Sequence, residues 1–367
     1  MSDWRFIVDH NSYADFSVSV SPAIEKAVVS GEAPPTVFLC LFDADSITIG
    51  VNEDPEQALD LEFCDQHNIA FRRRLNGGGA IYAGKGSALI VLTLKTDHER
   101  VPDTSADAFP QILTAFAEVF ARRYGFEAEY RPLNDIQVEG RKLVPTSLKI
   151  ENGVMTMRFV VNLKPIDTEM AGRTMPMPPE KVADKELKDL TSRFTWLERE
   201  AKREISSAEL EAFTLDCIEH AFGETNLERS NLIAAENSYA EDFRAQFEAD
   251  DWLFGKSERN RFRDLLRPGD TVGRGRVKAV GGMIRATLAI RDGRVLQAII
   301  NGDWHPRPID GIGWLEEALT GVAAEPAALK DCAGAFLDRL DIEFAGVEKA
   351  DLTSALEKAL ADQQPGL

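Results

Sequence analysis

The chain has 367 residues, of which 44% are apolar and 28% charged, and its 61 acidic and 42 basic residues give a formal net charge of −19. At roughly 100–200 residues per domain, this length indicates a globular protein of two domains. The negative charge argues against a surface that binds nucleic acid, and apolar stretches such as residues 88–94 are too short to span a membrane.

Residues 1–165 alternate between predicted strands and helices. Short runs of β-branched and aromatic residues at 36–42 and 46–50 predict two strands that pair with each other. Residues 58–68 predict a helix, and the apolar residues 88–94 predict another strand. A long amphipathic helix follows at 109–126, with Gly125 as its C-cap.

Two hairpins are predicted after this helix. The first covers residues 135–144 and turns at Glu139-Gly140, and the second covers 147–163 and turns at Asn152-Gly153. Asn-Gly is the strongest short-range signal for a tight hairpin turn. Residues 175–200 are rich in Pro and Lys and then helical in pattern. A well-marked helix at 206–223 begins with a capping box.

The second half of the chain predicts a separate domain. Residues 228–242 resemble a linker, which places a boundary near residue 236. Beyond it we expect strands at 272–280, 283–290 and 294–302, a helix at 314–321, and a polar helical tail over about the last 15 residues. Strands followed by helices are typical of a small α+β domain. We therefore predict domains at 1–235 and 236–367.

Cysteine and histidine usage narrows the setting and the chemistry. The four cysteines form no CxxC pair, which favours a reducing compartment, and the first 16 residues lack the layout of a signal peptide. We therefore expect a cytoplasmic protein without a membrane segment. The five histidines show no HxxxH or HExxH spacing and predict no zinc-type site.

The most informative segment is residues 72–89, RRRLNGGGAIYAGKGSAL. Three consecutive glycines after a strand let the backbone approach a ligand closely and present several N–H groups to an anion. Arg73 and Arg74 add fixed positive charge suited to phosphate or carboxylate. A glycine-rich turn with arginines in solvent is the alternative, and the spacing fits neither the P-loop nor the GxGxxG pattern.

A second segment, residues 133–143, places a carboxylate and a lysine on neighbouring strands. Asn134 and Asp135 stand where a strand begins, and Arg141 and Lys142 follow a tight turn. Such a pair could hold Mg²⁺ and counter developing negative charge. Taken alone, the segment also fits a hairpin that faces solvent.

In this order and spacing, the two segments resemble the lipoate–protein ligase A family of the biotin/lipoate ligase superfamily. The family's glycine motif, RR-x-S/T-GGGAVYHD-x-GN, reads RRLNGGGAIYAGKGS here, and its later motif, ND-(I/L)-x-V-x-GRK, reads NDIQVEGRK. Residues 46–74 and 178–197 are similar to further family segments. Residues 251–262 and the strands after them resemble the family's accessory domain.

The resemblance implies an α/β (α+β) fold, with a mixed-sheet catalytic domain and a small C-terminal α+β accessory domain. It implies ATP-dependent activation of lipoate to lipoyl-AMP with Mg²⁺, and transfer of the acyl group to a lysine of an acceptor lipoyl-domain protein; octanoate is the alternative acid. By the same match, Lys142 is the catalytic residue and Asp135 the Mg²⁺ ligand. The residues that would bind substrate or nucleotide are Arg73, Arg74, Asn76, Gly77, Gly78, Gly79, Ala80, Tyr82, Asn134, Lys181 and Lys185.

Several motif positions depart from the family pattern. The replaced positions are Val51, Asn76, Ala83, Gly84, Ser87, Val144, Pro145, Thr156, Met157 and Arg158. Two alternatives therefore stay open: an ATP-independent transferase that moves a lipoyl or octanoyl group from an acyl donor, and a non-catalytic protein of this fold that binds lipoyl domains. No cysteine is close to Lys142 in the sequence, which argues against a thioester mechanism. Docking of an acidic acceptor on this acidic chain needs a local basic patch, for which residues 72–74 and 141–142 are candidates.

Overall fold

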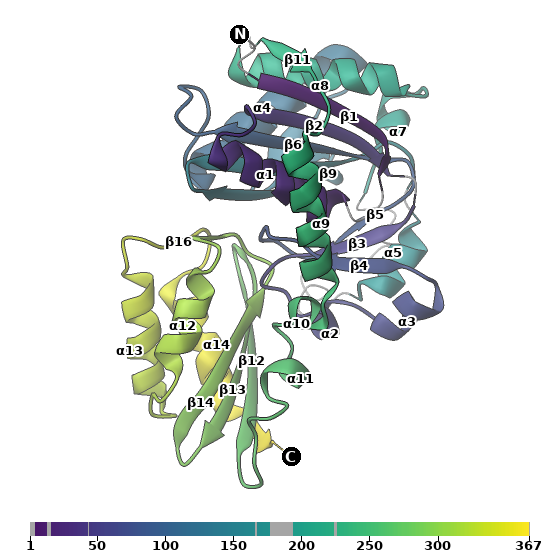
Figure 1. Cartoon of the computed structure of the whole chain (residues 1–367). Coiled ribbons are helices and arrows are strands. Elements are labelled where there is room, and N and C mark those ends of the chain that lie inside the picture. Colours follow the sequence, from purple (N-terminus) through teal and green to yellow (C-terminus); the bar gives the residue numbers. More distant parts are fainter. Residues whose placement is uncertain are drawn as a thin grey trace. The chain divides into compact units, whose positions relative to one another are not determined.

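The computed structural model describes residues 4–12, 16–42, 44–165, 167–176, 194–223 and 226–366. It divides into two compact units. The N-terminal unit comprises Met1–Thr48, Asp60–Arg74 and Ile81–Phe247, and the C-terminal unit comprises Ile49–Leu59, Leu75–Ala80 and Glu248–Leu367. Both units mix strands and helices, which confirms the predicted fold class (Figure 1). The change of unit at 247–248 lies close to the boundary expected near 236, but two short earlier segments join the C-terminal unit.

The N-terminal unit is built on an eight-stranded mixed sheet in the order β11-β1-β2-β6-β10-β9-β8-β7. β1 runs parallel to β2 and β11, whereas β2, β6, β10 and β9 pair antiparallel. The strands are β1 (Trp4–Ser12), β2 (Thr36–Phe42), β6 (Ser87–Lys95), β7 (Glu129–Arg131), β8 (Asp135–Val138), β9 (Arg141–Glu151), β10 (Val154–Asn162) and β11 (Leu227–Arg229). Both predicted hairpins are confirmed, with positive φ angles at Glu139-Gly140 and Asn152-Gly153.

A second sheet of this unit has three strands in the order β4-β3-β5. They are β3 (Ser46–Ile49), β4 (Ala70–Arg73) and β5 (Ile81–Ala83). The predicted pairing of residues 36–42 with 46–50 is wrong, because β2 pairs with β1 and β6 while β3 pairs with β5. Since β2 is buried almost throughout, it needs a neighbour on each side, and β1 and β6 supply both.

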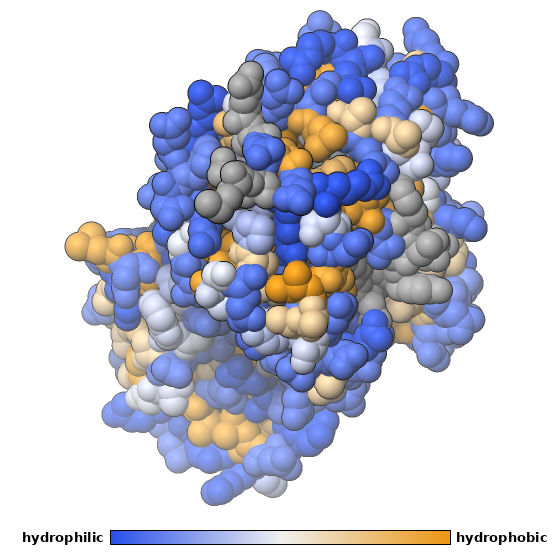
Figure 2. All heavy atoms as spheres, turned by 45° about the horizontal axis from the view of Figure 1, so that its top comes forward, coloured by the Kyte–Doolittle hydropathy of each residue, from blue (hydrophilic) through white to orange (hydrophobic). Residues whose placement is uncertain are grey.

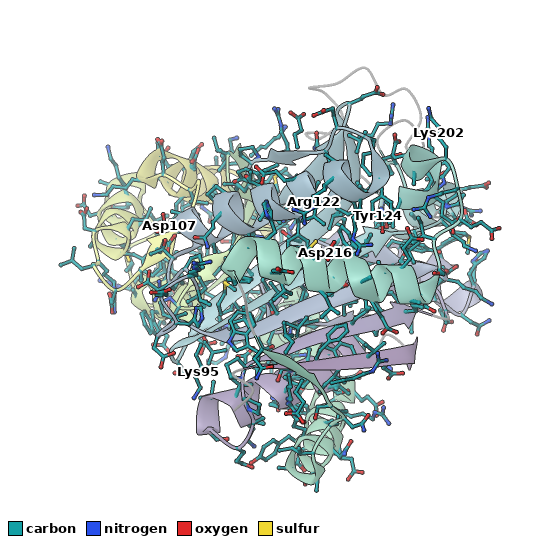
Figure 3. All side chains as sticks on the ribbon, turned by 90° about the horizontal axis from the view of Figure 1, so that it is seen from above. Lys95, Asp107, Arg122, Tyr124, Lys202 and Asp216 are labelled. Carbon is teal, nitrogen blue, oxygen red and sulfur yellow. The ribbon has the colours of Figure 1, made fainter. Side chains whose placement is uncertain are left out.

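Helices cover both faces of the large sheet (Figure 1). α4 (Ser105–Tyr124) and α8 (Ser207–Phe222) lie side by side on one face, where Figure 3 labels Arg122, Tyr124 and Asp216. Phe116 of α4 stacks on Phe159 of β10 with ring centroids 4.3 Å apart. On the other face lies α1 (Ser21–Ser30), which follows η1 (Phe16–Val20). The other helices in the described part of the unit are α3 (Leu61–Gln66), α5 (Thr168–Thr174), α7 (Leu197–Ala201) and α9 (Ala234–Glu248).

The predicted linker at 228–242 is wrong, because most of it lies in α9. A buried ion pair fixes the start of this helix: Arg5 of β1 bonds through both terminal nitrogens to the carboxylate of Glu236. The same carboxylate accepts the N–H of Ile233 at 2.8 Å. The pair joins residues far apart in the sequence, so the local polar pattern carries no sign of it.

The C-terminal unit has a four-stranded sheet in the order β14-β13-β12-β17 and a two-stranded ribbon, β15-β16. Its strands are β12 (Thr271–Ala279), β13 (Gly282–Arg291), β14 (Arg294–Gly302), β15 (Pro306–Arg307), β16 (Glu343–Phe344) and β17 (Gln363–Pro365). Its helices are α2 (Pro55–Ala58), α10 (Asp250–Leu253), α11 (Glu258–Arg261), α12 (Gly311–Leu319), α13 (Pro326–Leu337) and α14 (Lys349–Ala361). The three strands and the helix expected at 272–321 are confirmed. The expected helical tail ends at Ala361, and β17 follows it.

The surface fits a strongly charged chain. Figure 2 shows a face covered mostly by hydrophilic side chains, with hydrophobic residues scattered among them. Among the described residues, no helix is long and apolar enough to cross a membrane.

Candidate functional site

The β8–β9 hairpin brings together the predicted catalytic lysine and the predicted metal ligand. Nζ of Lys142 lies 2.8 Å from Oδ2 of Asp135, and their side chains are 34% and 16% exposed. The other carboxylate oxygen of Asp135, Oδ1, is buried and accepts no hydrogen bond from any described residue. The pair therefore presents a fixed cation and a spare anionic acceptor at one place.

Backbone and side-chain bonds hold this hairpin in position. The side-chain amide of Asn134 donates to the carbonyl of Thr146 at 2.7 Å, and the Thr146 hydroxyl donates to the carbonyl of Asn134 at 2.7 Å. The carbonyl of Lys142 accepts the N–H of Thr195 at 3.0 Å. In this structure Asn134, predicted to bind substrate or nucleotide, ties β9 to the start of β8.

Three other predicted residues lie in or beside the small sheet of the N-terminal unit. Arg73 ends β4, and Arg74 follows it and donates to the carbonyl of Thr48 at 3.0 Å. Both arginines are only 2% exposed, so they do not form the exposed basic patch expected for docking. Tyr82 lies on β5, where burial raises the pKa of its hydroxyl, with a further contribution from Asp45.

The glycine segment, residues 75–80, packs within the C-terminal unit. The N–H of Gly78 donates to the carbonyl of Trp304 at 2.8 Å. A Cβ atom on Gly77 would lie 2.4 Å from the same carbonyl oxygen, and one on Gly50 would lie 1.8 Å from the carbonyl oxygen of Gly78. Glycines at these positions allow three backbone segments to approach closely. The central N–H that was predicted to face an anion is bonded here to a carbonyl.

The segment Ile49–Leu59, which contributes Gly50, is held in the C-terminal unit by buried polar contacts. Glu53 forms an ion pair with Arg285 of β13 at 2.8 Å, and Asp54 accepts a hydrogen bond from the Ser257 hydroxyl at 2.6 Å. This attachment was not predicted from the sequence. The acidic run at residues 53–54 is its only local signal, because both partners come from much later in the chain.

The residues present suit a single-carboxylate Mg²⁺ site better than a protein cage. Within the described ranges, no three His, Cys, Asp or Glu side chains are grouped to hold a metal ion. Mg²⁺ commonly keeps several waters and takes one or two carboxylates together with substrate phosphates. Asp135 Oδ1 fits that role. Lys181 and Lys185, the other predicted binding residues, lie outside the described residues.

The described part of the N-terminal unit contains Cys40, Cys64 and Cys217, and it shows no contact of any of them with Lys142. Cys64 and Cys217 are buried, and burial raises the pKa of both thiols. Cys40 of β2 lies on the same sheet face as the Lys142–Asp135 pair. Three strand spacings separate β2 from β9, which is about 14 Å at ~4.8 Å per strand. A thiol that attacks an acyl group at Lys142 has to be nearer than this.

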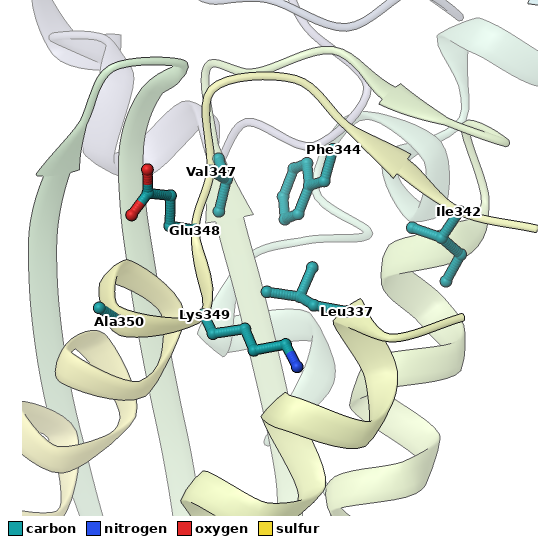
Figure 4. Close-up of a pocket in the computed structure, with 7 residues that line it drawn as sticks. All are labelled: Leu337, Ile342, Phe344, Val347, Glu348, Lys349 and Ala350. Carbon is teal, nitrogen blue, oxygen red and sulfur yellow. The ribbon is translucent and has the colours of Figure 1, made fainter. Parts of the chain in front are cut away.

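The C-terminal unit contains a pocket of about 530 Å³ (Figure 4). Its walls come from the end of α13, the β16 region and the start of α14. Of its two charged side chains, Lys349 forms an ion pair with Asp338, and Glu348 caps α14 together with Asp351. These contacts stabilise the unit, and the pocket is not lined by any of the described residues that were predicted for catalysis or binding.

Comparisons with known proteins agree on one family. Residues 16–219 match the model of the Lipoyl protein ligase A/B catalytic domain. Octanoyltransferase LipM of Kyrpidia tusciae is 24% identical over 278 residues, covering 70% of this chain and 100% of that protein. Lipoate–protein ligase 1 of Staphylococcus aureus is 22% identical over 317 residues, covering 86% and 89%. The crystal structure of LipL1 of P. falciparum with lipoate has the same fold, with a TM-score of 0.69 at 13% identity, covering 98% of this chain and 99% of that one.

Proposed function

The chain belongs to the lipoyl protein ligase A/B catalytic-domain family, and we propose that it activates lipoate, or a related medium-chain acid, with ATP and transfers the acyl group to a lysine of an acceptor lipoyl domain in the cytoplasm. The Lys142–Asp135 pair carries this proposal. It combines a cation, held at 2.8 Å by one carboxylate oxygen, with a second carboxylate oxygen that has no hydrogen-bond donor among the described residues.

Each member of the pair has a distinct role in acyl transfer. The Lys142 ammonium stabilises the negative charge that develops on the acyl and phosphate oxygens as the acceptor amine attacks, a kind of contact whose removal typically costs about 10²–10³ in rate. Asp135 orients the ammonium through Oδ2, and its Oδ1 would hold Mg²⁺. The acid would first displace pyrophosphate from ATP to form the acyl-AMP, and the acceptor amine would then displace AMP; bound Mg²⁺ would neutralise part of the phosphate charge.

Two observations favour ATP-dependent activation. The alignment with lipoate–protein ligase 1 covers 86% of this chain, whereas the alignment with the LipM protein covers 70%. A larger part of this chain is therefore similar to the lipoate–protein ligase than to the octanoyltransferase. In addition, the thiol that shares the sheet face of Lys142 lies about 14 Å across the sheet at ~4.8 Å per strand, too far for a covalent relay at the lysine.

A second candidate function is transfer of an octanoyl group from an acyl carrier without ATP. Its support is the 24% identity along the full length of octanoyltransferase LipM. Under this alternative, Cys40 is the thiol to test, because it lies on the sheet face of the Lys142–Asp135 pair.

An assay with the purified full chain and an acceptor lipoyl domain separates the candidates. We expect pyrophosphate release and an increase in acceptor mass only when lipoate or another medium-chain acid, ATP and Mg²⁺ are all present. Transfer from an octanoyl carrier without ATP, abolished by Cys40→Ser, would instead establish the second candidate. Binding of the lipoyl domain with no transfer under either condition would contradict both and favour a non-catalytic role.

A further inference from the structure

A buried arginine in the N-terminal unit lacks partners for most of its guanidinium. Arg158 of β10 is 4% exposed. Its Nη2 donates to the Ser21 hydroxyl of α1 at 2.7 Å, whereas Nε and Nη1 make no hydrogen bond with any described residue. Leaving a buried charged donor unsatisfied is costly, so a position of this kind is typical of a site that receives an anion.

The nearest carboxylate does not fill this need. Glu25 of α1 bonds to Lys149 at 2.6 Å through Oε1 and to the Thr156 hydroxyl at 2.8 Å through Oε2. Its charge acts on Arg158 only through space, and burial lowers the pKa of the guanidinium to about 10. Even so, the side chain stays charged at neutral pH and retains two nitrogens able to bind an oxygen anion.

Strand register places Arg158 on the sheet face of the Lys142–Asp135 pair. Asp135 lies opposite Pro145, two residues along β9 from Ser147, and Ser147 lies opposite Arg158. Because side chains alternate between faces, these positions share one face. A bulge in β9 adds one residue between Lys142 and Pro145, so Lys142 lies four pairing positions from Ser147, about 13 Å at ~3.3 Å per position.

Two apolar side chains lie on this face between the charged positions, Pro145 of β9 and Val160 of β10, while the buried Ser147 lies opposite Arg158. Val160 belongs to the hydrophobic cluster under α1 and lies opposite Leu89 of β6. The face therefore has a lysine and a carboxylate at one end, apolar side chains between, and a buried guanidinium at the other end. That order matches the chemistry of an acyl chain with a second polar group at its far end.

We propose that Arg158 binds the terminal carboxylate of a medium-chain dicarboxylic acid whose other carboxyl group reacts at Lys142. The inference rests on the proposed acyl-transfer function and names the substrate class of that site. It also gives a role to Arg158 as one of the positions that depart from the family pattern.

Equilibrium binding of octanedioate and octanoate to the full chain tests the proposal. These acids have the same chain length and differ only at the far end. We expect the wild-type protein to bind octanedioate at least about tenfold more tightly, the range for a charge-assisted hydrogen bond. Arg158→Met, which removes the charge and keeps similar bulk, should abolish that preference, and Arg158→Lys should keep part of it. The midpoint of thermal unfolding is measured for each variant.

Equal or tighter binding of octanoate by the wild-type protein would overturn the proposal, as would an unchanged preference in Arg158→Met. If Arg158→Met fails to fold, the wild-type preference and its reduction in Arg158→Lys decide the question. A purely structural role would shift the unfolding midpoint and leave the ratio of affinities unchanged. Transfer of lipoyl or octanoyl groups without any octanedioate preference would reject this inference and leave the proposed function standing. Arg158-dependent octanedioate binding without ATP-dependent transfer would do the reverse.

Discussion

The glycine segment at 75–80 and the hairpin at 135–142 carry the two motifs of the family, yet they use their residues in different ways. In the glycine segment the backbone is engaged in packing: the Gly78 N–H bonds to the Trp304 carbonyl, and the space at Gly77 is filled by that same carbonyl. In the hairpin, the Lys142 and Asp135 side chains contact each other and leave one carboxylate oxygen of Asp135 without a donor.

The two motifs therefore differ in how specifically each identifies what it contacts. A run of glycines indicates that something approaches the backbone closely, but either a ligand or another stretch of the chain can occupy that space. A lysine and a carboxylate on adjacent strands indicate both the charge and the spacing of the groups that they bind. The hairpin is therefore the stronger basis for a functional assignment.

The largest expected effect is the loss of acyl transfer in Lys142→Ala, which tests whether the hairpin is the functional motif. Removing the ammonium should lower the transfer rate about 10²–10³-fold, because it takes away the fixed positive charge beside the developing anion. The rate of acceptor modification, followed by mass spectrometry, measures it. Lys95→Ala, at the end of β6 in the same unit, is the matched control and should keep the wild-type rate. Wild-type transfer by Lys142→Ala would refute the assignment.

Asp135→Asn tests the two roles assigned to this carboxylate, which are to orient Lys142 through Oδ2 and to hold Mg²⁺ through Oδ1. We expect a rate loss of about 10–100-fold, the usual cost of losing a metal ligand or its support. The Mg²⁺ concentration needed for half-maximal rate should also rise. If Asp135 serves only to orient Lys142 through Oδ2, the rate falls with no change in the Mg²⁺ requirement, and the metal role is wrong.

Local chemistry explains which parts of the fold were predictable. The β9–β10 hairpin follows from Asn152-Gly153, and α8 follows from Ser206 at its start and Gly223 at its end. Lys142 and Asp135 were predictable as neighbours because one short hairpin contains both. In each case, residues close in the sequence decide the structure.

Long-range contacts explain what the sequence pattern missed. The linker prediction failed because Glu236 bonds to Arg5 at the opposite end of the N-terminal unit's sequence. The partner of the glycine segment, Trp304, lies far along the chain, so the sequence around Gly78 does not predict this contact. Arg158 was visible as a departure from the family pattern, but its burial and its missing partners depend on α1 and the sheet.

Gly50→Ala tests whether the close backbone packing between Gly50 and the glycine segment stabilises the C-terminal unit. The new Cβ would lie 1.8 Å from the Gly78 carbonyl oxygen, so the backbone must shift. We expect a loss of about 1–3 kcal/mol in the free energy of unfolding, as for other overpacked sites, measured by denaturant titration. Gly334→Ala in α13, where nothing lies within 4 Å, is the control and should be neutral or stabilising. An unchanged stability in Gly50→Ala would show that this close approach is not required.

The smallest effect comes from Asp270, a carboxylate whose oxygens are both filled, unlike those of Asp135. Arg291 donates to Oδ1 at 2.9 Å and to Oδ2 at 2.7 Å, and the Arg267 N–H donates to Oδ2 at 2.7 Å. These donors, Arg291 first, lower the pKa of Asp270 from 3.8 to about 2. Because the folded-state pKa is depressed, the stabilisation is present above about pH 4 and disappears as the pH falls towards 2. Asp270→Asn should therefore lower the thermal midpoint slightly at pH 7, and its difference from the wild-type protein should shrink between pH 4 and pH 2. Asp331→Asn, at an exposed position, is the control and should follow the wild-type curve throughout. A constant difference between Asp270→Asn and the wild-type protein at every pH would show that the Asp270 carboxylate charge does not stabilise the C-terminal unit.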